Sequence, residues 1–241
     1  MTFATWRGTV GIIKPTMRPG GLEDMIRLLP EGIGVIGLYN DIRRGTREEF
    51  HKVMADYDDK VARLADAKVD MIHPEGAPPF MVMGLDGERR KVRGWEKQHG
   101  IPVFTSGMNH VRALKALKAK KFVGATYFSG DINRTFADYF AAAGLEPLAM
   151  EGIDVPFDEV QLLSSHRVYA HVKQAVLKHP KAEAIYMLGT GWQVLDVIEL
   201  LENDLGIPVV HPVTARVWEI LKRLHVRAPR TGFGRMLADP P

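Results

Sequence analysis

Short apolar runs alternate along the chain with segments whose apolar residues recur at helical spacing, and Gly or Pro bounds most of the runs. The runs predict strands over Thr9–Ile13, Gly32–Tyr39, Val69–His73, Gly100–Val103, Lys121–Tyr127, Ile185–Leu188 and Gly206–Val209. The periodic segments predict helices over Leu22–Leu29, Thr46–Ala67, Glu88–His99, Val111–Leu117, Asn133–Ala143, Leu163–His179, Val194–Leu201 and Arg216–Leu224. Val155–Glu159 is predicted to be a loop. This alternation indicates parallel sheets covered by helices on both faces.

The tetrapeptide Gly-Ile-Pro-Val occurs twice, at Gly100–Val103 and at Gly206–Val209, each time between two predicted helices. The offset of 106 residues (206 − 100) is close to half of the 241-residue chain. We therefore predict an α/β fold of two pseudo-symmetric parallel-sheet halves. Residues 1–115 and 220–241 would form the N-terminal half, and residues 116–219 the C-terminal half. Ligands bind at the carboxyl ends of parallel strands, so we expect the site in the cleft between the halves.

The stretch Ala184–Glu202 begins as a buried strand and resumes at helical spacing after Gly189, Thr190 and Gly191. A strand that passes through glycines into a helix brings backbone N–H groups and the positive end of a helix dipole together. We therefore expect this loop to bind an anion. Trp192 follows the glycines directly, and its indole fits core packing and ligand contact equally well.

The composition, with 46% hydrophobic and 25% charged residues, is that of a soluble globular protein. The net charge is only +3, and the short lysine-rich patch at Lys115–Lys121 favours a solvated helix face over a nucleic-acid footprint. The chain has no cysteine, which excludes disulfides, thiolate metal ligands and cysteine nucleophiles. It has neither a secretory signal nor an apolar run of about 18 residues. We expect a cytoplasmic protein that binds neither nucleic acid nor membrane.

Four loop residues are candidates for proton transfer. Lys14 follows the first strand, and an apolar cleft would lower its pKa, although a solvated strand-end lysine fits the pattern as well. His73 and Glu75 would face the same side of an extended chain, as a general acid–base pair requires. His211 lies in a loop of the second half that should converge on them. Arg18 could bind a carboxylate through two hydrogen bonds.

Two further interpretations concern histidines. His73, Glu75 and His211 form a known type of metal ligand set, but nothing in their spacing is diagnostic, and we predict no metal. His110 is predicted to lie on a helix as a surface or N-terminal residue.

Several segments resemble the aspartate/glutamate racemase superfamily and, within it, the arylmalonate decarboxylase family. They are GIIKPTMRPGG, GAPPFMVMG, GIPVFTSG, LGTGWQVLDVIELLENDLGIPVV and RTGFGRML. The resemblance covers almost the whole chain and implies two pseudo-symmetric α/β domains with the site between them. It also implies an enzyme without a cofactor that acts on a small carboxylic or dicarboxylic acid, as a monomer or homodimer.

The chain departs from this family at the residues that carry chemistry. Racemases and maleate isomerases of the superfamily have a cysteine in each of two signature loops, and the decarboxylases keep the second one as proton donor. Gly76 and Gly189 stand at these two positions. Ala77 and Pro78 replace residues that would offer hydroxyls. Thr190 stands at a glycine position, where its amide can still donate.

Two aromatic hydroxyl positions of the family fall on Phe50 and Phe128, although a shift of one residue would place Tyr127 at the second. The resemblance implies the following substrate-binding residues: Pro15, Thr16, Arg18, Phe50, Gly76, Ala77, Pro78, Tyr127, Phe128, Gly189, Thr190, Gly191 and Trp192.

The implied chemistry is decarboxylation through an enediolate that backbone amides stabilise. Since no thiol is present, another group must donate the proton, and Lys14, His73, Glu75 and His211 are the candidates. Two alternatives remain open. The protein could be a divergent hydrolase or isomerase using His/Glu acid–base chemistry, or a non-catalytic carboxylate-binding protein.

Overall fold

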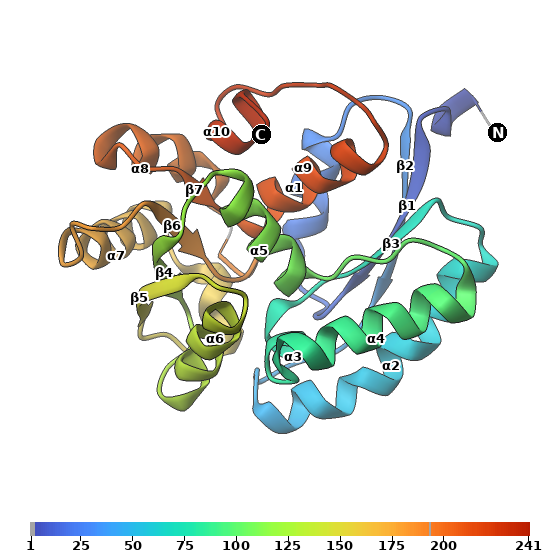
Figure 1. The fold of residues 1–241 in the computed structure, drawn as a ribbon, viewed down its shortest axis with the longest axis horizontal. Helices are drawn as coiled ribbons and strands as arrows, with labels where there is room; N and C mark the ends of the chain where they lie inside the picture. The colour runs from blue at the N-terminus through green and yellow to red at the C-terminus, as the bar shows by residue number, and fades with distance from the viewer. Residues whose placement is uncertain (1–2, 193) are drawn as a thin grey trace.

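The computed structural model describes residues 3–192 and 194–241, so Gln193, within the stretch Ala184–Glu202, lies outside it together with Met1 and Thr2. The strands form two parallel sheets, one on the right and one on the left of Figure 1. The first has the order β2-β1-β3, with β1 at Gly8–Lys14, β2 at Ile33–Tyr39 and β3 at Met71–Pro74. The second has the order β5-β4-β6-β7, with β4 at Lys121–Thr126, β5 at Glu146–Gly152, β6 at Ala184–Met187 and β7 at Val209–Val210.

The two sheets repeat one topology. In each, the first strand is flanked by the second strand on one side and the third on the other. A single parallel bridge joins Ile72 to Val103, so the first Gly-Ile-Pro-Val segment takes the place that β7 has in the second sheet. The predicted α/β fold of two pseudo-symmetric parallel sheets is thereby confirmed. Where one half ends and the other begins stays a prediction.

Helices cover both sheets and fill the space between them (Figure 1). Helix α9 contacts both α1 and α5, and it is buried continuously from Pro212 to Leu221 because it lies at the centre of the molecule. The α-helices are α1 Gly21–Leu28, α2 Arg47–Asp66, α3 Ala77–Met81, α4 Gly84–His99, α5 Ser106–Ala116, α6 Asp131–Ala142, α7 Ser165–Leu177, α8 Ile198–Leu205, α9 Pro212–Arg223 and α10 Arg235–Ala238. The 3-10 helices are η1 Phe3–Thr5, η2 Phe157–Leu162 and η3 Leu195–Val197.

The sequence pattern missed strand β5 altogether. This strand lies at a sheet edge and is only half-buried, so its apolar alternation is weak, and Pro147 interrupts its register with β4. The segment predicted as a loop at Val155–Glu159 leads into η2. Helices α4, α5 and α9 each begin about one turn earlier than predicted, since their first turns carry Gly, Ser or Pro rather than periodic apolar residues.

The helix predicted from Val194 begins as a 3-10 turn and not as an α-helix. The first helical turn after β6 is η3, and α8 begins only at Ile198. The indole of Trp192 is completely buried in the core. The N-terminus of α8 therefore does not contribute a dipole at the glycines, and the loop offers only its own N–H groups.

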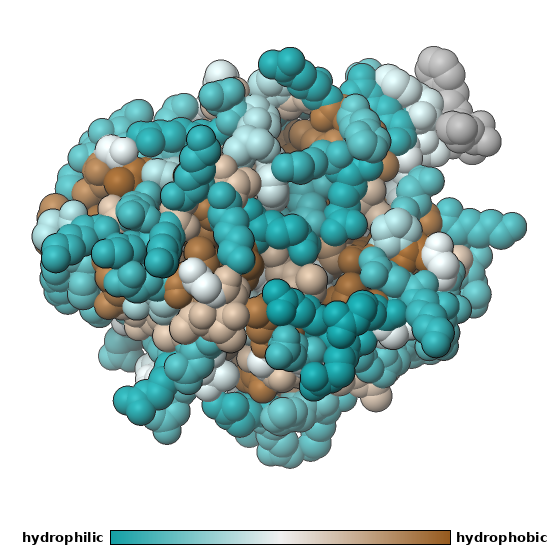
Figure 2. Space-filling model, in the orientation of Figure 1, coloured by the Kyte–Doolittle hydropathy of each residue, from teal (hydrophilic) through white to brown (hydrophobic). Residues whose placement is uncertain are grey.

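The face shown in Figure 2 is largely hydrophilic, with small apolar patches scattered between charged side chains. Among residues 3–192 and 194–241, no helix has both the length and the apolar character needed to cross a membrane.

Candidate active site

A pocket opens where the carboxyl ends of the two sheets meet. The loops that follow β1, β3, β4 and β6 contribute to its wall, as does Pro212, the first residue of α9 after β7. The lining is mostly apolar, and its polar side chains are Lys14, Thr16, Arg18, Glu75, Ser106, His110, Tyr127 and Thr190. The apolar and glycine lining residues are Pro15, Pro19, Gly21, Ile42, Phe50, Gly76, Ala77, Pro78, Pro79, Phe128, Phe157, Gly189, Gly191 and Pro212.

Most of the residues that the sequence pointed to meet in this pocket. Gly76 and Gly189 line it together, one from each half. Lys14 and Glu75 line it as well, as do all the expected substrate-binding residues except Trp192. His73, His211 and Trp192 are buried outside the lining.

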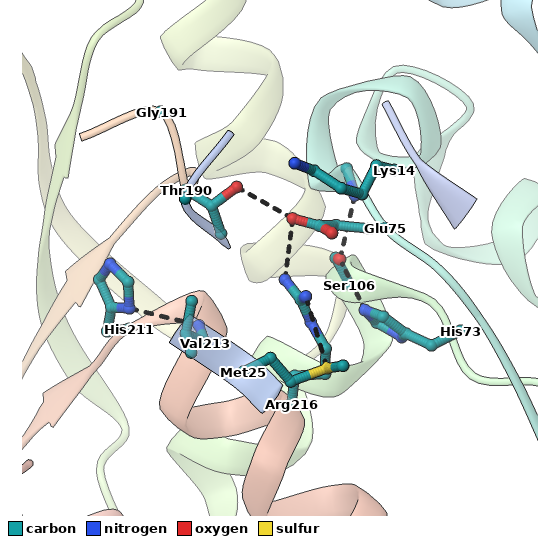
Figure 3. A network of polar contacts seen from close by, with 12 residues as sticks. Lys14, Met25, His73, Glu75, Ser106, Thr190, Gly191, His211, Val213 and Arg216 are labelled. Atoms are coloured by element: carbon teal, nitrogen blue, oxygen red, sulfur yellow. Dashed lines mark hydrogen bonds and ion pairs between the residues drawn. The ribbon is translucent and has the colours of Figure 1, made fainter. Parts of the chain in front are cut away.

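A buried polar network forms the floor of the pocket (Figure 3). The Thr190 hydroxyl donates to Oε1 of Glu75 over 2.9 Å. On the same oxygen, Nη2 of Arg216 forms an ion pair at 2.9 Å, with the two side chains 0% and 3% exposed. Arg216 also approaches the Met25 sulfur at 3.8 Å. The contacts of Glu75 therefore connect the loop after β3 to the loop after β6 and to α9.

Sequence reasoning missed Arg216 as a site residue. Its one signal was an arginine among the apolar positions of a helix, and such a position gives no indication of the partner that neutralises it.

Two cationic side chains, the buried Lys14 and the partly buried Arg18, line the pocket. The Lys14 ammonium donates to the carbonyl of Arg18, and it lies 5.4 Å from the centre of the Tyr39 ring. Burial lowers the pKa of Lys14, while the Glu75 carboxylate acts in the opposite direction. The Arg18 guanidinium stacks 4.1 Å from the centre of the Phe157 ring, and burial lowers its pKa. Since Arg216 neutralises Glu75, the positive charges of Lys14 and Arg18 are available to an anion.

Within the part of the chain that the structure describes, His73 forms no hydrogen bond or ion pair with Glu75. Its Nδ1 bonds the Phe104 carbonyl at 2.7 Å and its Nε2 lies 3.3 Å from the Ser106 hydroxyl, which accepts from the Gly76 amide. Burial, with the Arg216 charge as the next cause, lowers the pKa of His73 well below its ordinary value. The imidazole therefore stays neutral and positions Ser106 and the glycine loop.

His211 is the N-cap of α9, where its Nδ1 accepts from the Val213 amide at 3.2 Å. It stands apart from the Glu75 network in Figure 3. Burial and the Arg216 charge lower its pKa to about 3.

The prediction of a surface position for His110 is wrong, because α5 is buried between the halves and His110 lines the pocket with 1% exposure. Its Nδ1 is 2.9 Å from the Tyr186 hydroxyl, and its Nε2 is buried with no partner among the described residues. Burial, with the Arg216 charge as the next cause, lowers its pKa to about 3. Ser106, the other lining residue from α5, was also missed, although it comes shortly after the predicted strand Gly100–Val103.

A side chain at either signature glycine would meet a close neighbour, and that neighbour differs between the two positions. Gly76 has a φ of +101°, and a Cβ atom there would lie 2.9 Å from Cβ of Pro15. Gly189 has a φ of +93°, and a Cβ atom there would overlap the hydroxyl oxygen of Tyr127 and lie 2.7 Å from its Cε1. The space that a side chain at position 189 would need is therefore taken by the Tyr127 phenol.

Packing fixes this phenol. The ring meets Trp192 edge-on with a centroid distance of 5.2 Å, and it lies 5.0 Å from Phe128. Its oxygen accepts from the Gly191 amide at 3.4 Å. Burial raises the pKa of Tyr127 to about 12, and the Gly191 bond and the Arg18 charge act in the opposite direction.

Within residues 3–192 and 194–241, no group of three or more His, Cys, Asp or Glu side chains is arranged to hold a metal ion. His73, Glu75 and His211 are thus not gathered as a ligand set.

Comparison with known proteins connects this geometry to a family. The family model described as "Arylmalonate decarboxylase" matches residues 24–237. The arylmalonate decarboxylase of Bordetella bronchiseptica is 23% identical over 233 residues, which cover 96% of this chain and 97% of that protein. The maleate isomerase of Geobacillus stearothermophilus is 24% identical over 200 residues, 80% of this chain and 79% of that protein.

A solved structure shows the same fold. It is a mutant of Nocardia farcinica maleate cis-trans isomerase with a covalently bound succinylcysteine intermediate. It superposes with a TM-score of 0.86 at 21% identity, over 96% of this chain and 98% of that one.

Proposed function

Because the chain belongs to the arylmalonate decarboxylase family, we propose that it is a cofactor-independent carbon–carbon lyase that decarboxylates a small dicarboxylic acid. The observation that carries this proposal is the pocket between Gly76 and Gly189, which is mostly apolar and holds two cations in excess of its neutralised carboxylate. A dicarboxylate matches this excess charge. Lys14 and Arg18 are assigned to binding its carboxylates.

The electrostatic part of the reaction is assigned to backbone amides. Loss of carbon dioxide breaks one carbon–carbon bond and leaves its electron pair in an enediolate. Fixed N–H donors at the enediolate oxygens would stabilise this charge. The Gly76 amide already donates to Ser106 and the Gly191 amide to Tyr127. The proposal therefore assigns this stabilisation to the amides of Ala77 and Thr190.

The apolar wall of the pocket is assigned to the leaving carboxylate and to the substituent of the substrate. Phe50 and Phe128 lie edge to face at 6.2 Å, and Phe157 lies 5.6 Å from Phe128. A carboxylate against these rings would lose hydration, which favours its release as neutral carbon dioxide. The same rings would accept an aryl or alkyl substituent of the substrate.

Two observations favour decarboxylation over the alternatives. The intermediate in the Nocardia isomerase structure is a cysteine adduct, and this chain has no cysteine with which to form one. A hydrolase that activates water through His73 would need a base with a pKa near neutrality, whereas burial lowers this pKa far below that range. His73 and His211 are assigned to holding the loops in place, and Glu75 to positioning Thr190.

The test is turnover of defined acids by the purified protein. Phenylmalonate, 2-methyl-2-phenylmalonate, malonate and maleate are incubated with it, and products are followed by proton NMR together with carbon dioxide release. We expect carbon dioxide from a malonate. Conversion of maleate to fumarate alone would contradict the lyase assignment in favour of an isomerase. Thermal stabilisation by these acids without turnover would contradict catalysis in favour of a binding protein.

Two variants sharpen this test. Replacing Arg18 with Met should weaken binding and turnover together. Lys52→Met, which removes the exposed partner of Glu48 on α2, should leave both unchanged.

A further inference from the structure

We infer that the hydroxyl group of Tyr127 is the acid that protonates the substrate carbon, in the place that a side chain at position 189 would otherwise occupy. This inference rests on the proposed function and names the donor that a cysteine-free chain requires. The first observation is spatial. The phenol oxygen fills the volume next to the Gly189 Cα, inside the wall that the second half contributes to the pocket.

The second observation concerns the proton itself. The Tyr127 oxygen accepts a hydrogen bond from the Gly191 amide, so its lone pair is engaged on the loop side. Among the residues that the structure describes, no acceptor takes the Tyr127 hydroxyl hydrogen. This hydrogen is therefore available to a guest in the pocket, as a general acid requires.

The third observation is that the groups around the Tyr127 oxygen would also stabilise the phenolate that remains after proton transfer. The Gly191 N–H would strengthen as a donor to a charged oxygen. The charge of Arg18, which lines the same pocket, also favours the ionised form of Tyr127. Edge-to-face packing on Trp192 holds the ring still, so the oxygen does not have to move between the two states.

The step balances as follows. The bond from the substrate carbon to one carboxylate breaks, carbon dioxide leaves, and the electron pair stays in the enediolate. The carbon then takes the Tyr127 proton and forms a carbon–hydrogen bond, leaving a monocarboxylate and a phenolate. Water returns a proton to the phenolate and leaves hydroxide in the solvent.

This geometry has a stereochemical consequence. In the wall from the first half, Gly76, Ala77 and Pro15 carry no acidic proton. Two proton-bearing groups of that wall are already engaged, since the Lys14 ammonium donates to the Arg18 carbonyl and the Ser106 hydroxyl lies 3.3 Å from Nε2 of His73. A carbon held between the two walls would receive its proton from the Tyr127 side only. A prochiral malonate should therefore give a single enantiomer, with Tyr127 as the reason.

The experiment uses 2-methyl-2-phenylmalonate and measures kcat and the enantiomeric excess of 2-phenylpropionate. For Tyr127→Phe we expect kcat to fall about 100-fold or more, within the range that a general acid contributes. We also expect the remaining product to be close to racemic, since solvent then supplies the proton. The melting temperature and phenylmalonate affinity, measured on the same sample, establish that the variant is folded and binds.

Two controls separate this role from packing. Tyr169→Phe removes a hydroxyl that bonds Lys173 and Asp204 outside the pocket, and it should change neither readout. Lys14→Met should lower the rate and keep the enantiomeric excess. If Lys14→Met instead gives racemic product while Tyr127→Phe stays selective, Lys14 is the donor and the inference is overturned.

The outcomes also separate this inference from the proposed function. If the wild-type protein releases no carbon dioxide from any malonate, the proposed function fails and the donor assignment fails with it. If the wild type decarboxylates but Tyr127→Phe retains both rate and selectivity, or if the wild-type product is already racemic, only the assignment of Tyr127 fails.

Discussion

The guanidinium of Arg216 and the carboxylate of Glu75 form an ion pair from which water is almost completely excluded, with 2.9 Å between Nη2 and Oε1. Glu75 belongs to the loop after β3 and Arg216 to α9, so the pair joins the first sheet to the central helix. The Thr190 hydroxyl extends the contact to the second sheet. Each charge has lost its hydration, and each therefore depends on the other.

Breaking this pair should strongly destabilise the protein. For Arg216→Met we expect the free energy of unfolding in urea to fall by about 3–5 kcal/mol, because Glu75 is left as an uncompensated buried charge. Lys52→Met removes one partner of an ion pair that is 75% exposed on both sides, and it should cost less than about 1 kcal/mol. Equal, small losses for the two variants would show that the buried pair is not essential to the fold.

Stability should fall in mild acid because of the buried histidines. Burial lowers the pKa of His110 and His211 to about 3, and that of His73 well below 6.5. The unfolded chain therefore binds more protons than the folded one below pH 6.5. The contribution of these neutral histidines to the free energy of unfolding is complete above pH 6.5 and is lost as the pH falls toward 3. Within this pH range, each histidine lowers the free energy of unfolding by up to about 1.4 kcal/mol for every unit that the pH falls.

Urea unfolding at pH 7.5, 6.0 and 5.0 measures this slope. His110→Asn should reduce the slope of the free energy of unfolding against pH by the contribution of one histidine. Replacement of the exposed His51 with Asn should leave that slope unchanged. A free energy of unfolding that is constant between pH 7.5 and 5.0 would contradict the assignment.

Binding of a carboxylate should depend on the protonation of Lys14. Burial lowers its pKa from 10.5, so the amine loses its charge at a lower pH than a free lysine does. We expect phenylmalonate affinity, measured by calorimetry from pH 7 upward, to weaken with rising pH and to do so at a lower pH than 10.5. Lys14→Met should bind at least about 10-fold more weakly and lose the pH dependence. An unaltered affinity in this variant would remove Lys14 from the binding site.

Two glycine substitutions should have opposite effects. Gly94 lies in the middle of α4 with open space around it, so Gly94→Ala should stabilise the protein by about 0.5–1 kcal/mol. Gly76 has a φ of +101°, and a Cβ atom there would lie 2.9 Å from Cβ of Pro15, so Gly76→Ala should destabilise it by about 1–3 kcal/mol. Urea unfolding of both variants checks the signs, and two effects of the same sign would contradict the backbone argument.

The sequence was most informative about the elements around the pocket. Apolar runs identified six of the seven strands that the structure shows in residues 3–192 and 194–241, since central parallel strands are buried on both faces and need continuous apolar residues. Strand β5 escaped because an edge strand can be half-exposed and can tolerate Pro147. The repeated Gly-Ile-Pro-Val segment indicated the pseudo-symmetry that the two strand orders confirm.

The site was predictable only where it depends on loops that follow strands. Lys14, Glu75 and the two glycine loops line the pocket because the carboxyl ends of parallel strands meet at one edge. Ser106, His110 and Arg216 come from α5 and α9, and no local pattern indicates that these helices lie between the sheets. His73 lies near the end of β3 and His211 follows β7, but their side chains turn into the core to bond Phe104 and to cap α9.

By itself, the sequence determined the α/β class, the two-fold repeat and the absence of any thiol, because periodicity and composition are local properties of the chain. Only the tertiary structure decided that Arg216 neutralises Glu75 and that the Tyr127 oxygen stands beside Gly189. The physical reason is that both arrangements join residues far apart in the chain. The burial that sets their charge and protonation exists only once the two sheets have packed against α9.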